Sequence, residues 1–578
     1  MLLWFELGLS IAAVLLAIYS PGLGSAFLGT AERTFTRLAH RQRLSLLAVG
    51  VLALASRAAV LPVLPVPEPR LNDEFSHLLL ADTLAHSRLT NPTPPMWIHF
   101  ETFHVIMRPT YASMYPPAQG VSLALGQALG RQPFLGVCLS VAIMCTAICW
   151  MLQGWFSPGW ALLGGLIAVA RLGVFSYWAD SYWGGAMAAT GGALVLGALR
   201  RIMRSERRRD ALLMGIGLAI LANSRPYEGL IFSLPAAVAL FIWFVRRKGP
   251  SFSTSIRRVI VPLSLALVLA AGATGYYCWR VTGNPFRLPQ QVDRDTYAVA
   301  PYFLWQSPRP EPVYHHKEIR DFYLHNELNF YLGLHNSENL ISALIVRTVQ
   351  LWCFYLGPAL TLPLLLSIST LPLGFRAKRC GWDARFLFSA GMVSIAGLAV
   401  EVFFFPHYAA PMTCLIFAFL LMAMRRLRRW EWRGRPIGVS LTRAVPVICL
   451  VMLVLRAGAA PLHLSLAPDW PPTWYNLPPV KTDRARIQAV LDRRSGEHLV
   501  IVRYQPQSQS KYDWVYNEAD IESAKIVWAR DMGRAANREL IDYFNHRHAW
   551  LVEPDEAPPK LSPYPAQPNA NEGGPHDE

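Results

Sequence analysis

Long apolar runs, separated by short polar or basic segments, fill most of the chain. A helix that crosses a bilayer needs roughly 20 mostly apolar residues, and about twelve runs approach that length. They lie at approximately 2–20, 44–64, 133–153, 159–177, 185–199, 211–223, 228–245, 259–280, 348–373, 386–404, 408–424 and 441–460. This pattern predicts an α-helical polytopic membrane protein with about twelve transmembrane helices in residues 1–460.

The pattern changes after residue 460. Three stretches typical of strands and one amphipathic stretch typical of a helix follow, at 498–504, 525–528, 549–552 and 534–546 respectively. We therefore expect a small α/β domain within residues 461–554. Pro, Asn and Gly dominate residues 555–578, which predicts a disordered tail.

The composition fits a membrane protein but leaves the charge to be explained. Of the 578 residues, 53% are hydrophobic and 16% are charged, whereas soluble chains carry about 25% charged residues. The formal net charge is +16, which in a soluble protein would indicate a nucleic-acid partner. The eight cysteines lie in or beside apolar runs or in one short basic loop, without CxxC spacing. We predict neither a disulfide framework nor a zinc site.

The positive charge is concentrated in five short segments. Together they hold 26 Lys and Arg residues and five acidic residues, at 31–43, 200–210, 246–258, 375–385 and 425–443. With the predicted spans all five fall on one membrane face, and Lys and Arg gather on the cytoplasmic face. The charge is therefore a topology signal, and we expect no nucleic-acid partner. We expect a multi-pass inner (plasma) membrane protein whose N-terminus and C-terminal domain are extracytoplasmic, the latter periplasmic.

The opposite face holds two large loops, 65–132 and 281–347. The first begins Leu71-Asn72-Asp73-Glu74, in which Asn72 is a good helix N-cap and the two carboxylates follow in the first turn. Apolar residues then group on one side, as in a helix that lies at a membrane surface. Stabilisation of the helix dipole would by itself explain the acidic pair.

The setting of this pair gives it a second interpretation. A multi-spanning protein with Asp73-Glu74 at the start of its first large external loop, on an interfacial helix, resembles the GT-C glycosyltransferases. These include the protein O-mannosyltransferases and the aminoarabinose transferases of lipid A. The resemblance covers the architecture of residues 1–460 and, at motif level, mainly the acidic pair. It implies a GT-C-like transmembrane domain whose catalytic loop is 65–132.

The resemblance also implies a chemistry. The donor would be a sugar on a polyprenyl phosphate, and the acceptor would be attacked outside the cytoplasm. Asp73 would be the general base that removes the proton of an acceptor hydroxyl, and Glu74 would orient it or help to hold a divalent ion. A phosphate leaving group needs no strong acid, and one displacement would invert the anomeric centre. The acceptor class (lipid, glycan or protein) stays open.

The rest of the first external loop supplies three more candidates. Glu101 stands where some GT-C members place a second acidic residue near a divalent cation, here Mg²⁺ or Mn²⁺. His104 and Arg108 would contact the donor phosphate, the arginine as a charge-assisted fork. The alternative for each is an interfacial side chain that only hydrogen-bonds the loop, and for His104 we favour that alternative.

Polar residues elsewhere on this face are also candidates, because charge inside a membrane is costly and usually functional. Asn223-Ser224-Arg225-Pro226-Tyr227-Glu228 separates two apolar runs. We predict that Arg225 binds the donor phosphate with Glu228 as its partner, against the alternative of a structural ion pair. His407 and Tyr408 would reach the same phosphate, and Asp180 would accept hydrogen bonds from the sugar. For His407 and Asp180 a structural role is the favoured alternative.

Other function classes are less well supported. The chain has no GxxxxGK[ST] phosphate loop, which argues against an ATP-driven pump. A transporter or flippase of lipid-linked saccharides would show matched halves with broken helices, whereas one clear interruption and no repeat occur here. Such a transporter remains the alternative, together with a ligase or polymerase of lipid-linked glycans.

Overall fold

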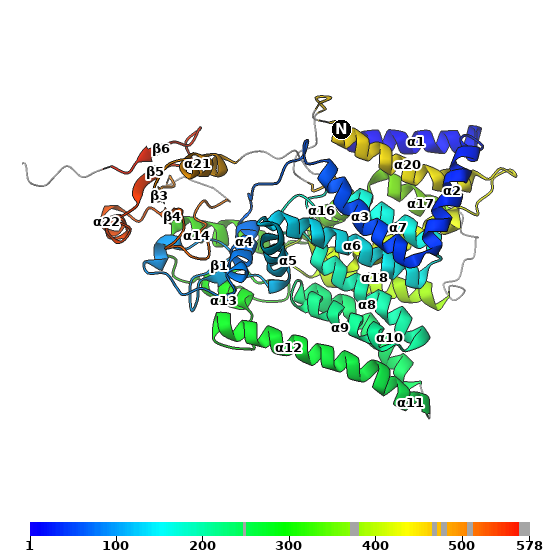
Figure 1. Ribbon diagram of the computed structural model, residues 1–578, viewed down its shortest axis with the longest axis horizontal. Coiled ribbons are helices and arrows are strands. Elements are labelled where there is room, and N and C mark those ends of the chain that lie inside the picture. Colours follow the sequence, from blue (N-terminus) through cyan, green and yellow to red (C-terminus); the bar gives the residue numbers. More distant parts are fainter. Residues whose placement is uncertain are drawn as a thin grey trace, which may run out of the picture.

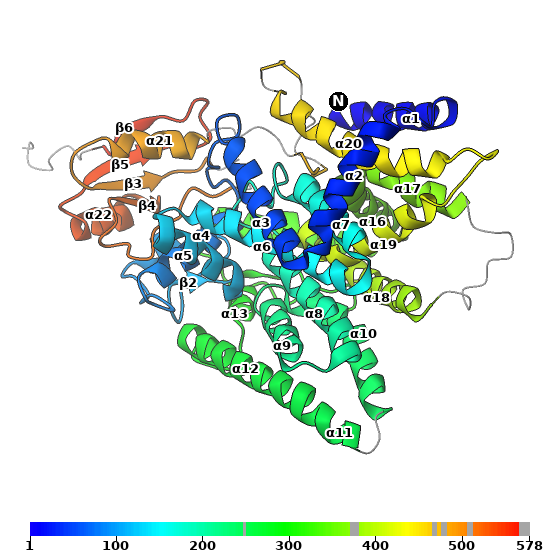
Figure 2. The same cartoon turned by 45° about the vertical axis from the view of Figure 1, so that its right-hand side comes forward.

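The computed structural model describes residues 1–246, 250–369, 381–459, 461–464, 471–475, 482–505 and 512–565. Three layers follow one another along the long axis (Figures 1 and 2). A bundle of long helices forms one end, a small unit with a β-sheet forms the other, and short helices from the external loops lie between them.

Each predicted apolar run coincides with a helix over most of its length. The helices are α1 (Leu2–Tyr19), α3 (Gln42–Ala59), α6 (Pro133–Trp155), α7 (Pro158–Leu172), α8 (Ala186–Ser205), α9 (Arg208–Ala222), α10 (Pro226–Val245), α12 (Val261–Thr282), α16 (Ser337–Leu351) continued by η4 (Trp352–Leu356) and α17 (Gly357–Ser369), α18 (Trp382–Ala399), η6 (Pro406–Met412) with α19 (Thr413–Leu427), and α20 (Ile437–Ala457). Within the described residues, nine helices are long and apolar enough to cross a membrane, and α7 is a shorter apolar helix. The predicted fold class is confirmed, but the count of twelve is not.

Proline fixes where several bundle helices begin. Pro133, Pro158 and Pro226 stand at the starts of α6, α7 and α10, where the missing N–H is harmless and φ is already helical. Because α9 ends at Ala222, the three polar residues before Pro226 form a tight turn. Arg225 is the N-cap residue of α10, so its side chain starts from a fixed point at a helix end.

Glycines let η6 lie directly against α8. A Cβ on Gly192 would be 1.9 Å from the carbonyl oxygen of Pro411, and one on Gly185 would be 2.7 Å from the Cβ of Ala410. Only glycine admits so close an approach. The turn of η6 thereby places His407 beside the aromatic turn that precedes α8, where its Nδ1 is 3.0 Å from the Tyr177 hydroxyl.

The basic segment 31–43, which separates two predicted spans, is mostly helical. Ser25–His40 form α2, with Phe35 and Leu38 packed against the bundle core and the arginines toward solvent. The prediction for this segment rested on its charges and did not consider the apolar residues that lie between them at helical spacing. Residues of the basic segment 246–258 likewise form α11 (Pro250–Ser255) and η2 (Ile256–Ile260). Residues 375–380 of the fourth basic segment lie outside the described residues.

The middle layer is built from the two external loops. Its elements are α4 (Asn72–Ala85), η1 (Trp97–Phe100), β1 (Val105–Ile106), β2 (Ala112–Ser113), α5 (Pro117–Gly130), α13 (Pro289–Tyr297), α14 (Lys317–Asp321), η3 (Phe322–Leu328) and α15 (Asn329–Gly333). The strands β1 and β2 pair antiparallel, with Val105 opposite Ser113. This hairpin folds the first loop back, so that residues on both sides of it reach the start of α4.

The C-terminal unit contains α21 (Asp483–Asp492), β3 (His498–Val502), β4 (Ile526–Arg530), α22 (Arg534–Tyr543), β5 (His548–Val552) and β6 (Leu561–Pro563). The sheet order is β4-β3-β5-β6, in which β3 is parallel to both neighbours and β6 is antiparallel to β5. The predicted α/β character is correct. The disordered tail was expected from residue 555, but β6 shows that order continues beyond it; residues 566–578 lie outside the described residues.

Candidate active site

Glu74 fixes the start of α4. Its carboxylate accepts hydrogen bonds from the backbone N–H groups of Arg70 at 2.8 Å and Leu71 at 3.0 Å, and from that of Tyr182 at 3.1 Å. The side chain is buried, and burial raises its pKa above the ordinary value despite these bonds. Both oxygens are thus engaged with the backbone. Glu74 holds α4 against the turn before α8 and does not line the cavity described below.

Asp73, the next residue back, points the other way and is held by two side chains of the same loop. It accepts a hydrogen bond from the Tyr115 hydroxyl, and its Oδ1 is 3.3 Å from His104 Nδ1. The Tyr115 hydroxyl is also 3.2 Å from that nitrogen. His77 stacks on the Tyr115 ring with centroids 4.4 Å apart. The carboxylate of Asp73, the phenol of Tyr115 and the imidazole of His104 therefore all contact one another.

The electrostatics of this contact favour a charged Asp73–His104 pair. Burial raises the pKa of Asp73, but His104, with smaller contributions from His77 and Arg225, brings the pKa below its ordinary value. In His104 burial lowers the pKa, yet Asp73 outweighs it and the pKa lies above 6.5. Burial, together with repulsion from Arg225 and His104, lowers the pKa of His77 to about 3 against the attraction of Asp73, so that neighbour stays neutral.

His104 is held in an unusual backbone conformation. Its φ is 62°, in the left-handed region that costs a non-glycine residue of order 1–3 kcal/mol. Its carbonyl oxygen accepts hydrogen bonds from the Ser76 hydroxyl at 2.6 Å and the Met114 N–H at 3.2 Å. The loop and α4 together hold the strained residue, which aims its ring at Asp73.

Arg225 faces this pair across one cavity of about 720 Å³. Its Nη1 is 3.3 Å from Glu228 Oε1, and its guanidinium lies over the Tyr408 ring, 4.2 Å from the centroid. Five of the predicted site residues line this cavity: Asp73, His104, Arg225, His407 and Tyr408. Glu228 does not line the cavity; its connection to the site is the ion pair with Arg225.

The far side of the cavity divides into a polar and an apolar part. Arg294 forms an ion pair with Glu327 at 2.6 Å, and Arg347 donates to the carbonyl oxygen of Val402 at 2.7 Å. Aromatic and aliphatic side chains complete the wall, among them Phe330, Val346, Phe403, Phe404 and Phe405. The cavity can therefore accept a molecule with an anionic group and an apolar portion.

Sequence reasoning missed several of these residues. Tyr115, Arg294, Glu327 and Arg347 are not among the predicted site residues. The only available signal was the presence of charges next to apolar segments in the second external loop and α16. No spacing rule relates them to Asp73.

The remaining predicted residues lie away from this cavity. Glu101 is buried and accepts a hydrogen bond from the Tyr297 hydroxyl at 2.8 Å, with His315 Nδ1 2.7 Å from its other oxygen. Arg108 lies over the Trp97 ring. Asp180 pairs with Arg57 at 3.2 Å, and burial raises its pKa to about 7. These contacts are those of structural side chains.

The expected divalent cation has no matching set of ligands around Glu101. Both of its oxygens already have protein partners, and nowhere in the described ranges do three or more His, Cys, Asp or Glu side chains gather as metal ligands would. The residues present do not fit the metal that the resemblance implied.

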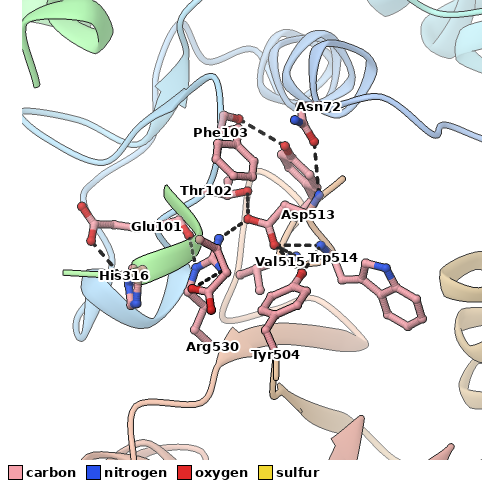
Figure 3. Close-up of polar contacts among 12 residues, drawn as sticks. Asn72, Glu101, Thr102, Phe103, His316, Tyr504, Asp513, Trp514, Val515 and Arg530 are labelled. Carbon is pink, nitrogen blue, oxygen red and sulfur yellow. Dashed lines mark hydrogen bonds and ion pairs between the residues drawn. The ribbon is translucent and has the colours of Figure 1, made fainter. Parts of the chain in front are cut away.

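The C-terminal unit contains a buried ion pair, Asp513–Arg530, whose two residues also contact the first external loop (Figure 3). Asp513 accepts a hydrogen bond from Thr102 at 2.7 Å, and its backbone N–H donates to Asn72 Oδ1 at 3.3 Å. Arg530 donates to the Glu101 carbonyl oxygen at 2.9 Å. Leu71, not Asn72 as expected, is the N-cap residue of α4, which leaves the Asn72 amide for this contact. The two residues of the ion pair thus contact Asn72, which precedes Asp73, and Glu101 and Thr102, which lie shortly before His104.

No family model matches the chain, and no curated protein matches its sequence. Solved structures resemble it at low identity. ArnT from Cupriavidus metallidurans bound to undecaprenyl phosphate is 11% identical, with a TM-score of 0.46 over 88% of this chain and 92% of that chain. The oligosaccharyltransferase AglB from Archaeoglobus fulgidus, in complex with an inhibitory peptide and a dolichol-phosphate, is 10% identical, with a TM-score of 0.42 over 88% and 69%. A likeness of this size carries no information on donor, acceptor or catalytic residues.

The ion pair yields a first prediction. Arg530→Met leaves the Asp513 carboxylate buried without its countercharge, which costs about 3–5 kcal/mol. We expect the C-terminal unit to become sensitive to protease and to unfold at lower temperature, measured on protein in detergent by limited proteolysis and thermal unfolding. The matched control is Arg538→Met, on the exposed side of α22, which should leave both unchanged.

The double variant Arg530→Met with Asp513→Asn removes both charges but keeps an oxygen that can accept the hydrogen bonds made to Asp513, and it should recover part of the lost stability. A single variant as stable as the parent protein would contradict a stabilising role for the pair.

Proposed function

We propose that this protein is a membrane glycosyltransferase. It transfers a sugar from a polyprenyl-phosphate donor to an acceptor hydroxyl at the extracytoplasmic face, with inversion at the anomeric carbon. The observation that carries this proposal is the single cavity in which Asp73 and His104 face Arg225 and His407, beside an apolar wall. A base, a phosphate-binding cation and a surface for a hydrocarbon chain thereby share one space.

Asp73 acts as the general base. It takes the proton of the acceptor hydroxyl as that oxygen attacks the anomeric carbon. Its lowered pKa makes it a weak base, which suits a reaction in which bond breaking to a phosphate leads and the hydroxyl becomes acidic only late. The hydrogen bonds from Tyr115 and His104 fix the carboxylate and keep it ionised before the acceptor binds.

Arg225 receives the leaving phosphate. A guanidinium forms charge-assisted hydrogen bonds with phosphate oxygens, and the ring of Tyr408 beneath it holds its plane. Glu228 balances the charge of Arg225 when the cavity holds no donor. The polyprenyl chain lies along the phenylalanines of the wall.

The carboxylates in the cavity favour inversion. A hydrolase acting by the usual two-carboxylate route needs both groups flanking the scissile bond. Of the acidic residues that line the cavity, Glu327 is bound to Arg294 at 2.6 Å, which leaves Asp73 as the base. One base and a phosphate leaving group give one displacement.

Asp73→Asn tests the base. The amide keeps the shape of the side chain but cannot take the proton, so we expect transfer to fall by about 10²- to 10⁴-fold. The assay follows loss of sugar from a set of polyprenyl-phosphate sugars by mass spectrometry, with the protein in liposomes. Asp295→Asn, in the external layer and outside the cavity, is the control and should keep full activity. Full activity of Asp73→Asn would remove the assignment.

Arg225→Gln tests the phosphate contact. Loss of a hydrogen bond to a charged group costs about 1.5–3 kcal/mol, or roughly a tenfold to hundredfold rise in the donor concentration for half-maximal rate. Arg225→Lys keeps the charge and should lie between this variant and the parent protein. Arg280→Gln, at the end of α12 and not in the cavity, is the control. An unchanged donor dependence in Arg225→Gln would make the arginine a structural residue.

The charged pair predicts a pH dependence. His104 is protonated below its raised pKa and loses the proton as pH rises through it, so the interaction that fixes Asp73 is lost on the alkaline side. We expect kcat/KM to fall there, while the acid limb, set by Asp73, lies below 3.8. In His104→Gln the alkaline limb should disappear. An identical alkaline limb in that variant would show that another group sets it.

A further inference from the structure

A second large cavity runs along the bundle, and its charged end lies at the opposite end of the bundle from the middle layer. It is a groove of about 810 Å³ between α2, α3, α7 and α20, and it shares no lining residue with the cavity around Asp73. Apolar side chains form most of it, for example Phe35, Leu52, Leu163 and Leu453. Neither the proposed reaction nor any helix of the described chain uses this space.

The charged residues of the groove gather at one end. There Glu32 of α2 is held by two arginines: Arg428 at 3.0 and 3.2 Å, and Arg443 at 3.1 and 2.8 Å. These side chains are not sealed off, since Arg428 and Glu32 remain 35% and 37% exposed. Hydrogen bonds from Arg443 and Arg428 lower the pKa of Glu32 to about 2. Two positive charges thus meet one negative charge, which leaves one net positive charge at the mouth.

This end belongs to the basic face of the bundle. The Arg428 end of α19, the start of α20 and the turn before α7 meet here, and the basic segments around them are those expected on the cytoplasmic side. Helix α2 presents Leu28, Ala31 and Phe35 to the groove, while Arg33 and Arg37 are exposed. Figures 1 and 2 show α2 across the ends of the neighbouring bundle helices. That is the arrangement of a helix lying at a membrane surface.

From the mouth the groove follows the membrane-spanning direction. Its lining passes along α7 to Val174, just beyond the end of that helix, and along α20 to Leu453, near the opposite end of α20. An apolar channel that starts at the headgroup level and runs into the hydrocarbon region has the shape of a lipid. Basic sites between transmembrane helices on the cytoplasmic side select anionic headgroups, and each Lys or Arg near the surface contributes about 1 kcal/mol.

We infer that this groove binds one anionic phospholipid of the cytoplasmic leaflet, with its phosphodiester at Arg428 and Arg443 and its acyl chains along α7 and α20. Glu32 sets the selectivity. It holds the two guanidinium groups together at the mouth and cancels one charge, which matches the site to a headgroup with a single negative charge. The inference does not depend on the reaction at Asp73.

Native mass spectrometry tests it on full-length protein reconstituted in liposomes of equal phosphatidylglycerol and phosphatidylcholine, then extracted in mild detergent. We expect one phosphatidylglycerol to be retained per protein, in at least tenfold preference to phosphatidylcholine. Arg428→Gln with Arg443→Gln should lower its occupancy at least tenfold. Arg208→Gln, an exposed arginine of α9 on the same face but outside the groove, is the matched control and should retain it.

Two further variants keep the test decisive if the double variant folds poorly. Gly159 lines the groove, and a Cβ there meets no atom within 4 Å, so Gly159→Phe fills the space without changing the charge and should expel the lipid. Glu32→Gln adds one net positive charge and should raise retention of a doubly charged phosphatidic acid relative to phosphatidylglycerol. Equal retention of phosphatidylcholine and phosphatidylglycerol, or undiminished phosphatidylglycerol in both the double variant and Gly159→Phe, would overturn the inference. Detection of a bound protein segment in the groove, in place of a lipid, would also overturn the inference.

Discussion

The contact between Asp73 and His104 depends on a constraint that shapes the whole protein: a charge beside an apolar bundle must have a partner fixed in place. The aspartate stays ionised because the imidazole of a strained residue is held against it. Glu74 meets the same constraint by turning its carboxylate into the backbone. Two adjacent carboxylates on one helix turn therefore have opposite uses, one structural and one open to the cavity.

The bundle and the C-terminal unit support that contact from two sides. On the bundle side, the glycine faces of α8 admit η6 and with it His407, while Pro226 sets the helix end from which Arg225 projects. On the other side, the Asp513–Arg530 pair binds Asn72 and the segment before His104. Both halves of the cavity are thus positioned by contacts that involve the backbone as well as by contacts between side chains.

The features that could be predicted from the sequence are those that depend on short stretches of chain. Helix positions follow from the length and apolarity of each run, and Asp73 and Arg225 stood out because each is a polar residue at a helix start beside apolar segments. The basic segment that became α2 was misread because charge was weighed above helical spacing. Tyr115 and Arg294 could not be found, because their relation to Asp73 arises only when the loops fold onto each other. Glu101 was predicted for the same site, but a sequence distance does not tell which side of a hairpin a side chain faces; it faces Tyr297 and His315 instead.

The bond between Asn72 and Asp513 joins residues 441 positions apart. During synthesis the first external loop leaves the ribosome long before the segment that holds it. The bond to Asp513 can form only after the last bundle helices and the C-terminal unit have been synthesised. The contacts that hold the residues next to Asp73 are therefore completed among the last steps in the folding of the nascent chain.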